Sequence, residues 1–252
     1  MGFQASERVV ALNAQLEAFM QEHIYPREHE WEAFTLDQNN RWQVPDWFDV
    51  LREKAKAEGL WNLFLPEEYG DWGPGLKNVE IARIFETMSK VNWAQPIFNC
   101  NAPDRGNMEV LAKYGTAEQQ EQWLKPLLAG DIRSAYAMTE PQVASSDATN
   151  MELSMTRDGD EYVLNGRKWW TTGAINPRCK LMLVMGKSNP ENDRHRQHST
   201  ILVPRDTPGV TLVRELRVFD NLHSPGGEAE VLFDNVRVPI SNVIKGEGCG
   251  FE

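Results

Sequence analysis

The sequence predicts an α+β chain in which an all-α N-terminal helical domain is followed by an antiparallel β-barrel domain. Up to about residue 131, apolar residues recur at helical spacing between Gly and Pro breaks. After residue 131, short runs rich in β-branched, Leu and aromatic residues alternate with turn residues at fairly regular spacing, which is typical of a barrel or sandwich. We therefore expect a helical domain at 1–131, a β domain at 132–245 and a flexible interdomain linker at 246–252.

Five helices are expected in the first part. The first begins after Ser6, which suits an N-cap. In the second, Pro45 suits the first helical position and Gly59 the C-terminal cap. Thr116 and Gln119 match a capping box that opens the fifth helix. The expected helices cover the apolar pattern from Val9 to Met20, then residues 45–58, 78–91 and 106–114, and a last segment that ends before Gly130.

Seven strands are expected in the second part. Asp158-Gly159 between two of them is a strong hairpin signal, because this dipeptide adopts the turn that two-residue hairpins need. The polar stretch 187–197 is expected to be an exposed loop. The expected strands cover residues 134–138, 153–157, 161–170, 180–186, 200–204, 210–216 and 229–238.

Composition excludes several classes of function. The net charge of −11 over 252 residues disfavours binding to nucleic acid or to an anionic membrane. The three cysteines are far apart and form no CxxC pair, so neither a zinc site nor a disulfide framework is expected, and a reducing intracellular compartment fits best. No apolar run approaches the ~20 residues that span a bilayer. We expect no metal site and no membrane span.

The first cluster of residues that could form a functional site is Tyr136-Ala137-Met138-Thr139-Glu140-Pro141, together with the turn that follows it. It begins as a strand and breaks at Pro141. Ser145, Ser146 and Asp147 then form a turn of the kind that exposes backbone N–H groups to an anion such as a pyrophosphate. The alternative is an ordinary strand-to-loop transition, since Ser and Thr are common turn residues.

The second cluster is Lys168-Trp169-Trp170-Thr171-Thr172-Gly173. On a strand, neighbouring side chains face opposite sides, so one indole can enter the core while the other covers a ligand. Thr172 would then share a face with Trp170. The alternative is that both indoles pack in the core and its rim. Together the two clusters offer the hydroxyls, turns and aromatic faces that a flat, polar-edged ring such as a flavin needs.

The two clusters, in this order and at about this separation, resemble the flavin-binding signatures of the acyl-CoA dehydrogenase family. The family pattern is roughly Thr-Glu-Pro, a small-residue turn and Ser-Asp, and later Asn-Gly-x-Lys-x-Trp-x-Thr. This chain has Thr139-Glu140-Pro141, then Ser146-Asp147, then Asn165-Gly166-Arg167-Lys168-Trp169-Trp170-Thr171-Thr172. Further matches run along nearly the whole chain: Glu58-Gly59-Leu60-Trp61, Tyr114-Gly115-Thr116, Phe233-Asp234-Asn235-Val236-Arg237-Val238-Pro239 and Gly246-Glu247-Gly248-Cys249-Gly250-Phe251.

Some stretches resemble one branch of that family, acyl-CoA dehydrogenase family members 10 and 11. They are Ala102-Pro103-Asp104, Gly106-Asn107-Met108-Glu109, Gln142-Val143-Ala144-Ser145-Ser146 and His195-Arg196-Gln197-His198-Ser199. In this branch the family's Gly-rich turn is replaced by the residues from Gln142 to Ser145.

The resemblance implies FAD as cofactor and a role for each matching residue. Tyr136, Met138 and Thr139 would line the pyrimidine side of the flavin, Trp170 would lie against the ring, and Thr172 would hydrogen-bond near the reactive N5. Ser146 would lie where the phosphates of the cofactor meet the CoA arm. The remaining implied cofactor contacts are Ser145 and Thr171. Apart from the resemblance, Arg194 could meet the phosphates of CoA and so join Ser146 as a substrate contact; the alternative is that it lies in a solvated loop.

The resemblance also implies an activity, α,β-dehydrogenation of a fatty acyl-CoA with hydride transfer to flavin N5. In the family the α-proton is removed by a carboxylate from a C-terminal helical bundle, and this chain ends at Glu252. No catalytic residue is therefore expected within the chain, and Glu140 is expected to be a structural part of its turn. By itself the chain is expected to be inactive.

The partners that the resemblance implies are acyl-CoA, an electron-transferring flavoprotein, and further copies of the same protein in a dimer or tetramer. The implied location is the cytoplasm of a bacterium, or the mitochondria or peroxisomes of a eukaryote. Two alternatives stay open: a non-catalytic module that binds flavin, acyl-CoA or protein, and an acyl-CoA oxidase-like variant.

Overall fold

The computed structural model describes residues 5–223 and 225–252, apart from the side chains of residues 70 and 71. It divides into two compact units, Met1–Arg105 and Gly106–Glu252. Helices come first and strands follow, which confirms the predicted fold class. The boundary between the compact units falls in the first turn of α5 (Asp104–Tyr114). The domain limits 1–131, 132–245 and 246–252 stay a prediction.

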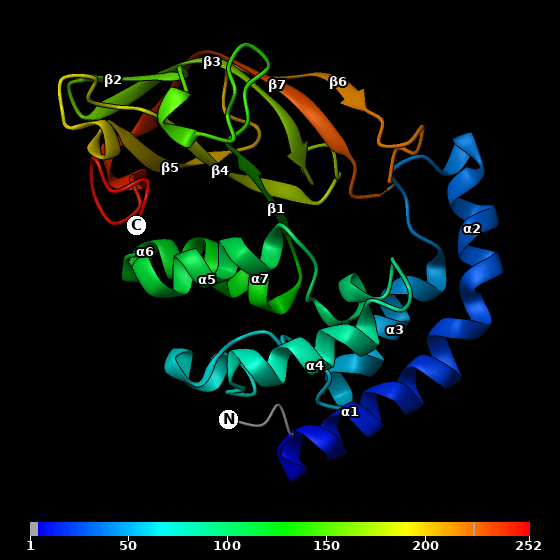
Figure 1. Ribbon diagram of the computed structural model, residues 1–252. Coiled ribbons are helices and arrows are strands. Elements are labelled where there is room, and N and C mark those ends of the chain that lie inside the picture. Colours follow the sequence, from blue (N-terminus) through cyan, green and yellow to red (C-terminus); the bar gives the residue numbers. More distant parts are fainter. Residues whose placement is uncertain (1–4, 224) are drawn as a thin grey trace. The chain divides into compact units, whose positions relative to one another are not determined.

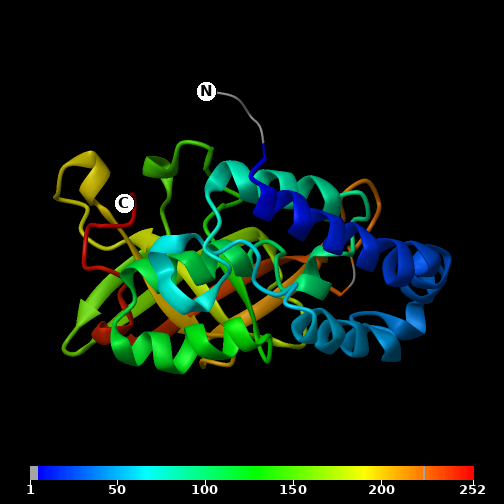
Figure 2. The same ribbon diagram turned by 90° about the horizontal axis from the view of Figure 1, so that it is seen from below.

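The first unit is built from four α-helices joined by short 3-10 and π turns. Ser6 caps the first of them, since its Oγ accepts from Val9 N at 3.4 Å. This helix, α1, lies beside α4 (Figures 1 and 2), and Thr87 Oγ1 donates to Asn13 Oδ1 at 2.8 Å between them. The helices are α1 (Glu7–Phe19), α2 (Glu28–Leu36), α3 (Asp46–Ala57) and α4 (Asn78–Met88).

Two expectations for this unit were wrong. Pro45 is the N-cap of α3, with an extended backbone (ψ 153°), and the helix starts one residue later. Gly59 follows α3 with φ +72°, which is the left-handed cap that was expected. The second error is an omission, because no helix was predicted at α2. This helix buries none of its side chains, so it has no apolar stripe by which sequence periodicity could detect it.

Three helices precede the sheet: α5 (Asp104–Tyr114), which begins at the end of the first unit, and α6 (Ala117–Gln119) and α7 (Lys125–Ala129) of the second. The capping box is confirmed, because Gln119 N donates to Thr116 Oγ1 at 3.2 Å and Thr116 N donates to Gln119 Oε1 at 3.1 Å. The helices lie along one side of the sheet (Figure 1). Asn107 Nδ2 donates to Ser134 Oγ at 2.9 Å and so ties α5 to the first strand.

The seven strands form one curled sheet in the order β1-β4-β2-β3-β7-β6, with β5 paired to β4 (Figure 1). Most neighbours are antiparallel, but β1 and β2 pair with β4 in parallel, so the sheet is mixed. Every predicted strand is present, with bounds within two residues of those expected. The strands are β1 (Arg133–Ala137), β2 (Ser154–Asp158), β3 (Glu161–Thr172), β4 (Cys179–Lys187), β5 (His198–Pro204), β6 (Val210–Leu216) and β7 (Glu228–Pro239).

The core of the second unit lies inside the curl of the sheet. Alternate residues of β1, β2, β3 and β7 point into it, including Ala135, Leu164, Val231 and Phe233, all at most 1% exposed. The hairpin signal at Asp158-Gly159 is confirmed, since Asp158 pairs with Glu161 across the turn and Gly159 has φ +63°.

The end of the chain is packed against β5. Gly248 N donates to Ser199 Oγ at 2.8 Å and Gly250 N donates to His198 O at 2.9 Å. Tyr162 OH also donates to the Glu247 carboxylate. The stretch expected to be a flexible linker is therefore bound to the sheet, because its backbone N–H groups find acceptors there. Within residues 5–223 and 225–252, no helix is long and apolar enough to cross a membrane.

Candidate functional site

The first cluster lies where β1 leaves the sheet. Pairing with β4 ends at Ala137, and the chain continues through Met138 and Thr139 into the turn. Tyr136, Met138 and Thr139 are half-buried, whereas Ala135 and Ala137 are in the core. The side chain of Tyr136 therefore lies on the other face of the sheet, with its hydroxyl 3.9 Å from Met185 Sδ, and burial raises its pKa.

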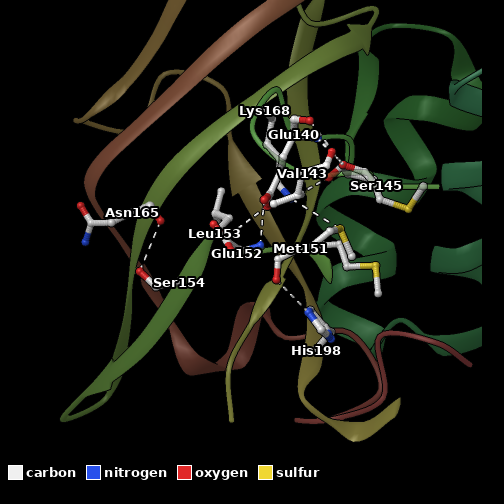
Figure 3. A network of polar contacts seen from close by, with 12 residues as sticks. Glu140, Val143, Ser145, Met151, Glu152, Leu153, Ser154, Asn165, Lys168 and His198 are labelled. Carbon is white, nitrogen blue, oxygen red and sulfur yellow. Dashed lines mark hydrogen bonds and ion pairs between the residues drawn. The ribbon is translucent and has the colours of Figure 1, made fainter. Parts of the chain in front are cut away.

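Glu140 organises the turn that follows (Figure 3). Its carboxylate is 4% exposed and accepts from Glu152 N at 2.7 Å and from Leu153 N at 2.8 Å. Its own N–H donates to Ser145 Oγ at 2.8 Å. The turn is thus fastened at both ends by side chains. Glu140 is a structural residue, because its carboxylate oxygens are already engaged.

Lys168 joins the two clusters (Figure 3). Its ammonium is fully buried and donates to Met138 O at 2.7 Å and to Glu140 Oε1 at 2.8 Å. Burial lowers the pKa of Lys168 to about 8 despite the attraction of Glu140. One cation therefore holds the end of β1, the turn and the middle of β3 together across 28 residues of sequence.

The backbone adds a second link. Trp169 N donates to Thr139 O at 2.9 Å, so the second cluster runs directly beside the first. At this point β3 carries a β-bulge: Lys168 pairs with Val231, but Thr171 pairs with Ala229. Trp170 sits in the bulge with φ +50° and is 40% exposed. A left-handed backbone is a strained choice for a bulky side chain and persists only where the surrounding structure enforces it.

The bulge changes which side chains share a face. Lys168 and Thr171 both enter the core, although they are three residues apart, since their partners Val231 and Ala229 belong to one face. The simple alternation expected from Trp169 onward is therefore broken. Thr172 lies on the opposite face from Thr171, is half-buried, and pairs with Glu228.

Two buried polar atoms of the second cluster have no hydrogen-bond partner among the described residues. They are Trp169 Nε1 and Thr171 Oγ1. Most buried polar groups in native proteins are paired, so each such atom calls for an explanation. The second cluster therefore contains an unpaired donor and an unpaired hydroxyl beside the exposed indole of Trp170.

The turn after Pro141 divides into a buried and an exposed part. Ser145 is buried, with its hydroxyl committed to Glu140 N, whereas Ser146 is exposed. Arg194 lies at the same turn, because its Nη2 is 2.6 Å from Asp147 Oδ2 and its Nε donates to Thr149 Oγ1 at 2.9 Å. Hydrogen bonds from Thr149, assisted by the charge of Arg194, lower the pKa of Asp147.

The residues predicted for a site thus fall into two adjacent groups. Tyr136, Met138, Thr139, Trp170 and Thr172 are partly exposed along the joined clusters. Ser146 and Arg194 are exposed at the neighbouring turn. By contrast, the side chains of Ser145 and Thr171 are buried.

Sequence reasoning missed the residues that hold this arrangement. The Lys168–Glu140 pair, the bulge, and the ion pairs of Glu230 with Arg167 and Arg214 were not foreseen. A Lys in the middle of a strand otherwise rich in core residues is the one signal that could have indicated a buried partner.

Two family models match the chain. The family model described as acyl-CoA dehydrogenase, N-terminal domain, matches residues 6–131. The model described as acyl-CoA dehydrogenase, middle domain, matches residues 135–236. The chain belongs to the acyl-CoA dehydrogenase family.

Individual relatives place the chain within the family. Acyl-CoA dehydrogenase family member 11 of Mus musculus is 51% identical over 257 residues, which cover 99% of this chain and 32% of that protein. Family member 10 of Mus musculus is 51% identical over 250 residues, covering 98% of this chain and 23% of that protein. The chain therefore spans about a third or less of these relatives. The branch suggested by the short motifs is confirmed.

Solved structures share the fold. A structure described as that of an acyl-CoA dehydrogenase from Mycobacterium abscessus superposes with a TM-score of 0.94 at 47% identity, covering 98% of this chain and 62% of that one. A glutaryl-CoA dehydrogenase from Mycobacterium smegmatis, in complex with FADH2, has a TM-score of 0.71 at 23% identity, covering 94% and 55%. At that identity the likeness concerns the fold alone.

Proposed function

We propose that the protein is an FAD-dependent acyl-CoA dehydrogenase and that this chain supplies one wall of its flavin site. The observation that carries the proposal is the joining of the two clusters, through Lys168 Nζ to Met138 O at 2.7 Å and Trp169 N to Thr139 O at 2.9 Å. Membership of the acyl-CoA dehydrogenase family supports it. A glutaryl-CoA dehydrogenase of the same fold was solved with FADH2.

The residues present fit a flavin. A flat ring with polar edges needs an aromatic face, hydroxyls and hydrogen-bond donors. Here Trp170 offers an exposed indole and Thr172 a half-buried hydroxyl, and the unpaired Trp169 Nε1 lies in the same cluster. We propose that Tyr136 and Met138 complete this wall. No described group of three His, Cys, Asp or Glu could hold a metal ion instead.

The residues of this chain would bind and orient the flavin. Trp170 would cover one face of the ring, and the hydroxyls of Thr139 and Thr172 would hydrogen-bond its polar edge. When bound, FAD supplies an acceptor for the hydride that leaves the β-carbon of the acyl chain. Lys168 and Glu140 keep the wall in place, because they fix Met138 and the turn at its edge.

The exposed turn would receive the anionic part of the ligands. Ser146 is exposed in this turn, and its neighbour Asp147 binds the guanidinium of Arg194. An exposed Arg beside a hydroxyl suits phosphate groups, such as those of CoA. The carboxylate that removes the α-proton is not Glu140, since that side chain is buried and paired with Lys168. We propose that it comes from outside this chain.

Partners follow from the same proposal. The substrate would be a fatty acyl-CoA, the electron acceptor an electron-transferring flavoprotein, and the assembly a dimer or tetramer of the complete protein. The location would be the cytoplasm, mitochondria or peroxisomes, according to the organism.

The test is flavin absorbance of the purified protein after reconstitution with FAD. We expect bound flavin bands that persist through gel filtration. A protein that retains no FAD under these conditions would contradict the proposal. Acyl-CoA-dependent dye reduction would then separate an enzyme from a binding module, and peroxide formation would reveal an oxidase.

A further inference from the structure

Glu230 lies opposite two irregularities of the sheet at once. Because Lys168 pairs with Val231 and Thr171 with Ala229, two residues of β3, Trp169 and Trp170, face the single residue Glu230. On the other side of β7, Leu212 pairs with Val231 and Arg214 with Glu230, so β6 carries an extra residue at the same level. Such bulges bend a strand and re-aim its side chains. Glu230 is the β7 residue that both bulges share.

The carboxylate of Glu230 spans the three strands. It is 4% exposed, accepts from Arg167 Nη1 of β3 at 2.8 Å, and accepts from Arg214 Nε of β6 at 2.6 Å. The hydrogen bond from Arg214 makes the largest contribution to lowering the pKa of Glu230, and the hydrogen bond from Arg167 lowers it further. The carboxylate therefore stays ionised. Glu230, Arg167 and Arg214 together form a rigid bracket across the three strands, because each charge-assisted hydrogen bond restricts both of its partners.

The bracket lies next to Trp170, whose left-handed backbone is strained. Trp170 has φ +50° and holds an exposed indole, a conformation that persists only where its surroundings enforce it. The hydrogen bond from Trp169 N to Thr139 O restrains the bulge from one side. Arg167, two residues before Trp169, is bound to Glu230 and restrains it from the other.

We propose that Glu230 is a positioning residue that, through Arg167 and Arg214, sets the bulge of β3 and thereby the orientation of Trp170 and Thr172. What these two residues bind rests on the proposed function. That Glu230 sets their orientation rests on the pairing of β3, β7 and β6 and on the contacts of Glu230 with Arg167 and Arg214. Glu230 itself need not touch the flavin or the substrate.

The experiment measures Trp170 directly. The protein is labelled with 5-fluorotryptophan, and the ¹⁹F resonance of Trp170 is assigned from Trp170→Phe. We expect this resonance to shift or broaden in Glu230→Gln and Glu230→Ala, since the bracket loses its charge or its acceptor. FAD affinity should fall about tenfold in the same variants, because a misaligned indole would lose its stacking contact with the flavin ring. Thermal unfolding shows whether each variant is folded.

Two further variants keep the result interpretable. Glu161→Gln is the matched control, because Glu161 starts β3, at the opposite end of that strand from the bulge, and accepts from Arg237 Nη1 of β7 at 3.1 Å. It should leave the Trp170 resonance in place. Arg214→Gln removes one exposed arm of the bracket while Arg167 still neutralises Glu230, so it should fold and give a smaller shift in the same direction.

The outcomes separate the two proposals. An unchanged Trp170 resonance in folded Glu230 variants overturns the positioning role. If the Glu230 variants unfold, an unchanged resonance in Arg214→Gln overturns it as well. A shift of equal size in Glu161→Gln also overturns it, because the effect would not be specific to the bracket. A wild-type protein that binds no FAD overturns the proposed function, while the Trp170 resonance still decides the role of Glu230.

Discussion

Replacing Lys168 by Met tests whether the buried ion pair holds the two clusters together. Methionine keeps the length and apolar stem of lysine but removes the ammonium, which donates to Met138 O at 2.7 Å and to Glu140 Oε1 at 2.8 Å. Glu140 would remain 4% exposed, with the N–H groups of Glu152 and Leu153 as its remaining donors. Breaking a buried pair from one side costs about 3–5 kcal/mol.

The assay is urea and thermal unfolding of the purified variant. For a protein of this size, a loss of about 3–5 kcal/mol corresponds to a fall in Tm of roughly 6–20 °C. Arg237→Met is the matched control, because it removes a positively charged side chain of β7 from an exposed ion pair with Asp158 at 2.8 Å. An exposed pair contributes about 0–1 kcal/mol, so this control should change Tm little.

A double-mutant cycle sharpens the result. Removing Glu140 together with Lys168, as Glu140→Leu with Lys168→Met, should cost less than the sum of the two single changes, by about 2 kcal/mol or more. The reasoning is refuted if Lys168→Met destabilises the protein no more than Arg237→Met, or if the two changes are additive. Either result would mean that the pair is not the link between the clusters.

Three further predictions concern ionisation and binding. Burial lowers the pKa of Lys168 from its ordinary 10.5 to about 8, so between these pH values the unfolded chain holds the extra proton. The free energy of unfolding of the wild type should therefore rise relative to Lys168→Met from pH 8 to 10.5, by at most about 3 kcal/mol in urea titrations. Thr172→Val should weaken FAD binding about threefold to tenfold in fluorescence titrations, through loss of one hydrogen bond, and leave Tm unchanged; unaltered affinity would remove Thr172 from the site. Arg194→Gln should weaken acyl-CoA binding more at low than at high salt in calorimetric titrations, because the side chain is exposed; a salt-independent loss would argue against a phosphate contact.

The local signals in the sequence determined most of the elements. Thr116 and Gln119 form the capping box that their spacing predicts, and β6 spans the residues that alternation predicts. These features depend on neighbours in the chain, so a window of a few residues contains the information. The helix α2 escaped prediction because it buries no side chain and so carries no pattern.

For the candidate site, sequence reasoning identified which residues lie along the two clusters, from their motifs and their order. It could not determine how the clusters meet. The Lys168–Glu140 pair joins residues that are 28 positions apart, and its strength comes from burial, which no local window records. The parallel pairing of β1 with β4 is likewise a long-range contact.

The sequence by itself thus determined the order of helices and strands, the family resemblance, and the identity of the residues that could face a ligand. The tertiary structure decided which of them are exposed and which are buried. Ser145 and Thr171 carry hydroxyls as Thr172 does, but the turn engages one and the bulge of β3 turns the other into the core. The physical reason is that a bulge adds one residue to one strand only. The side chains that follow it therefore change face, and only the partner strand reveals where that happens.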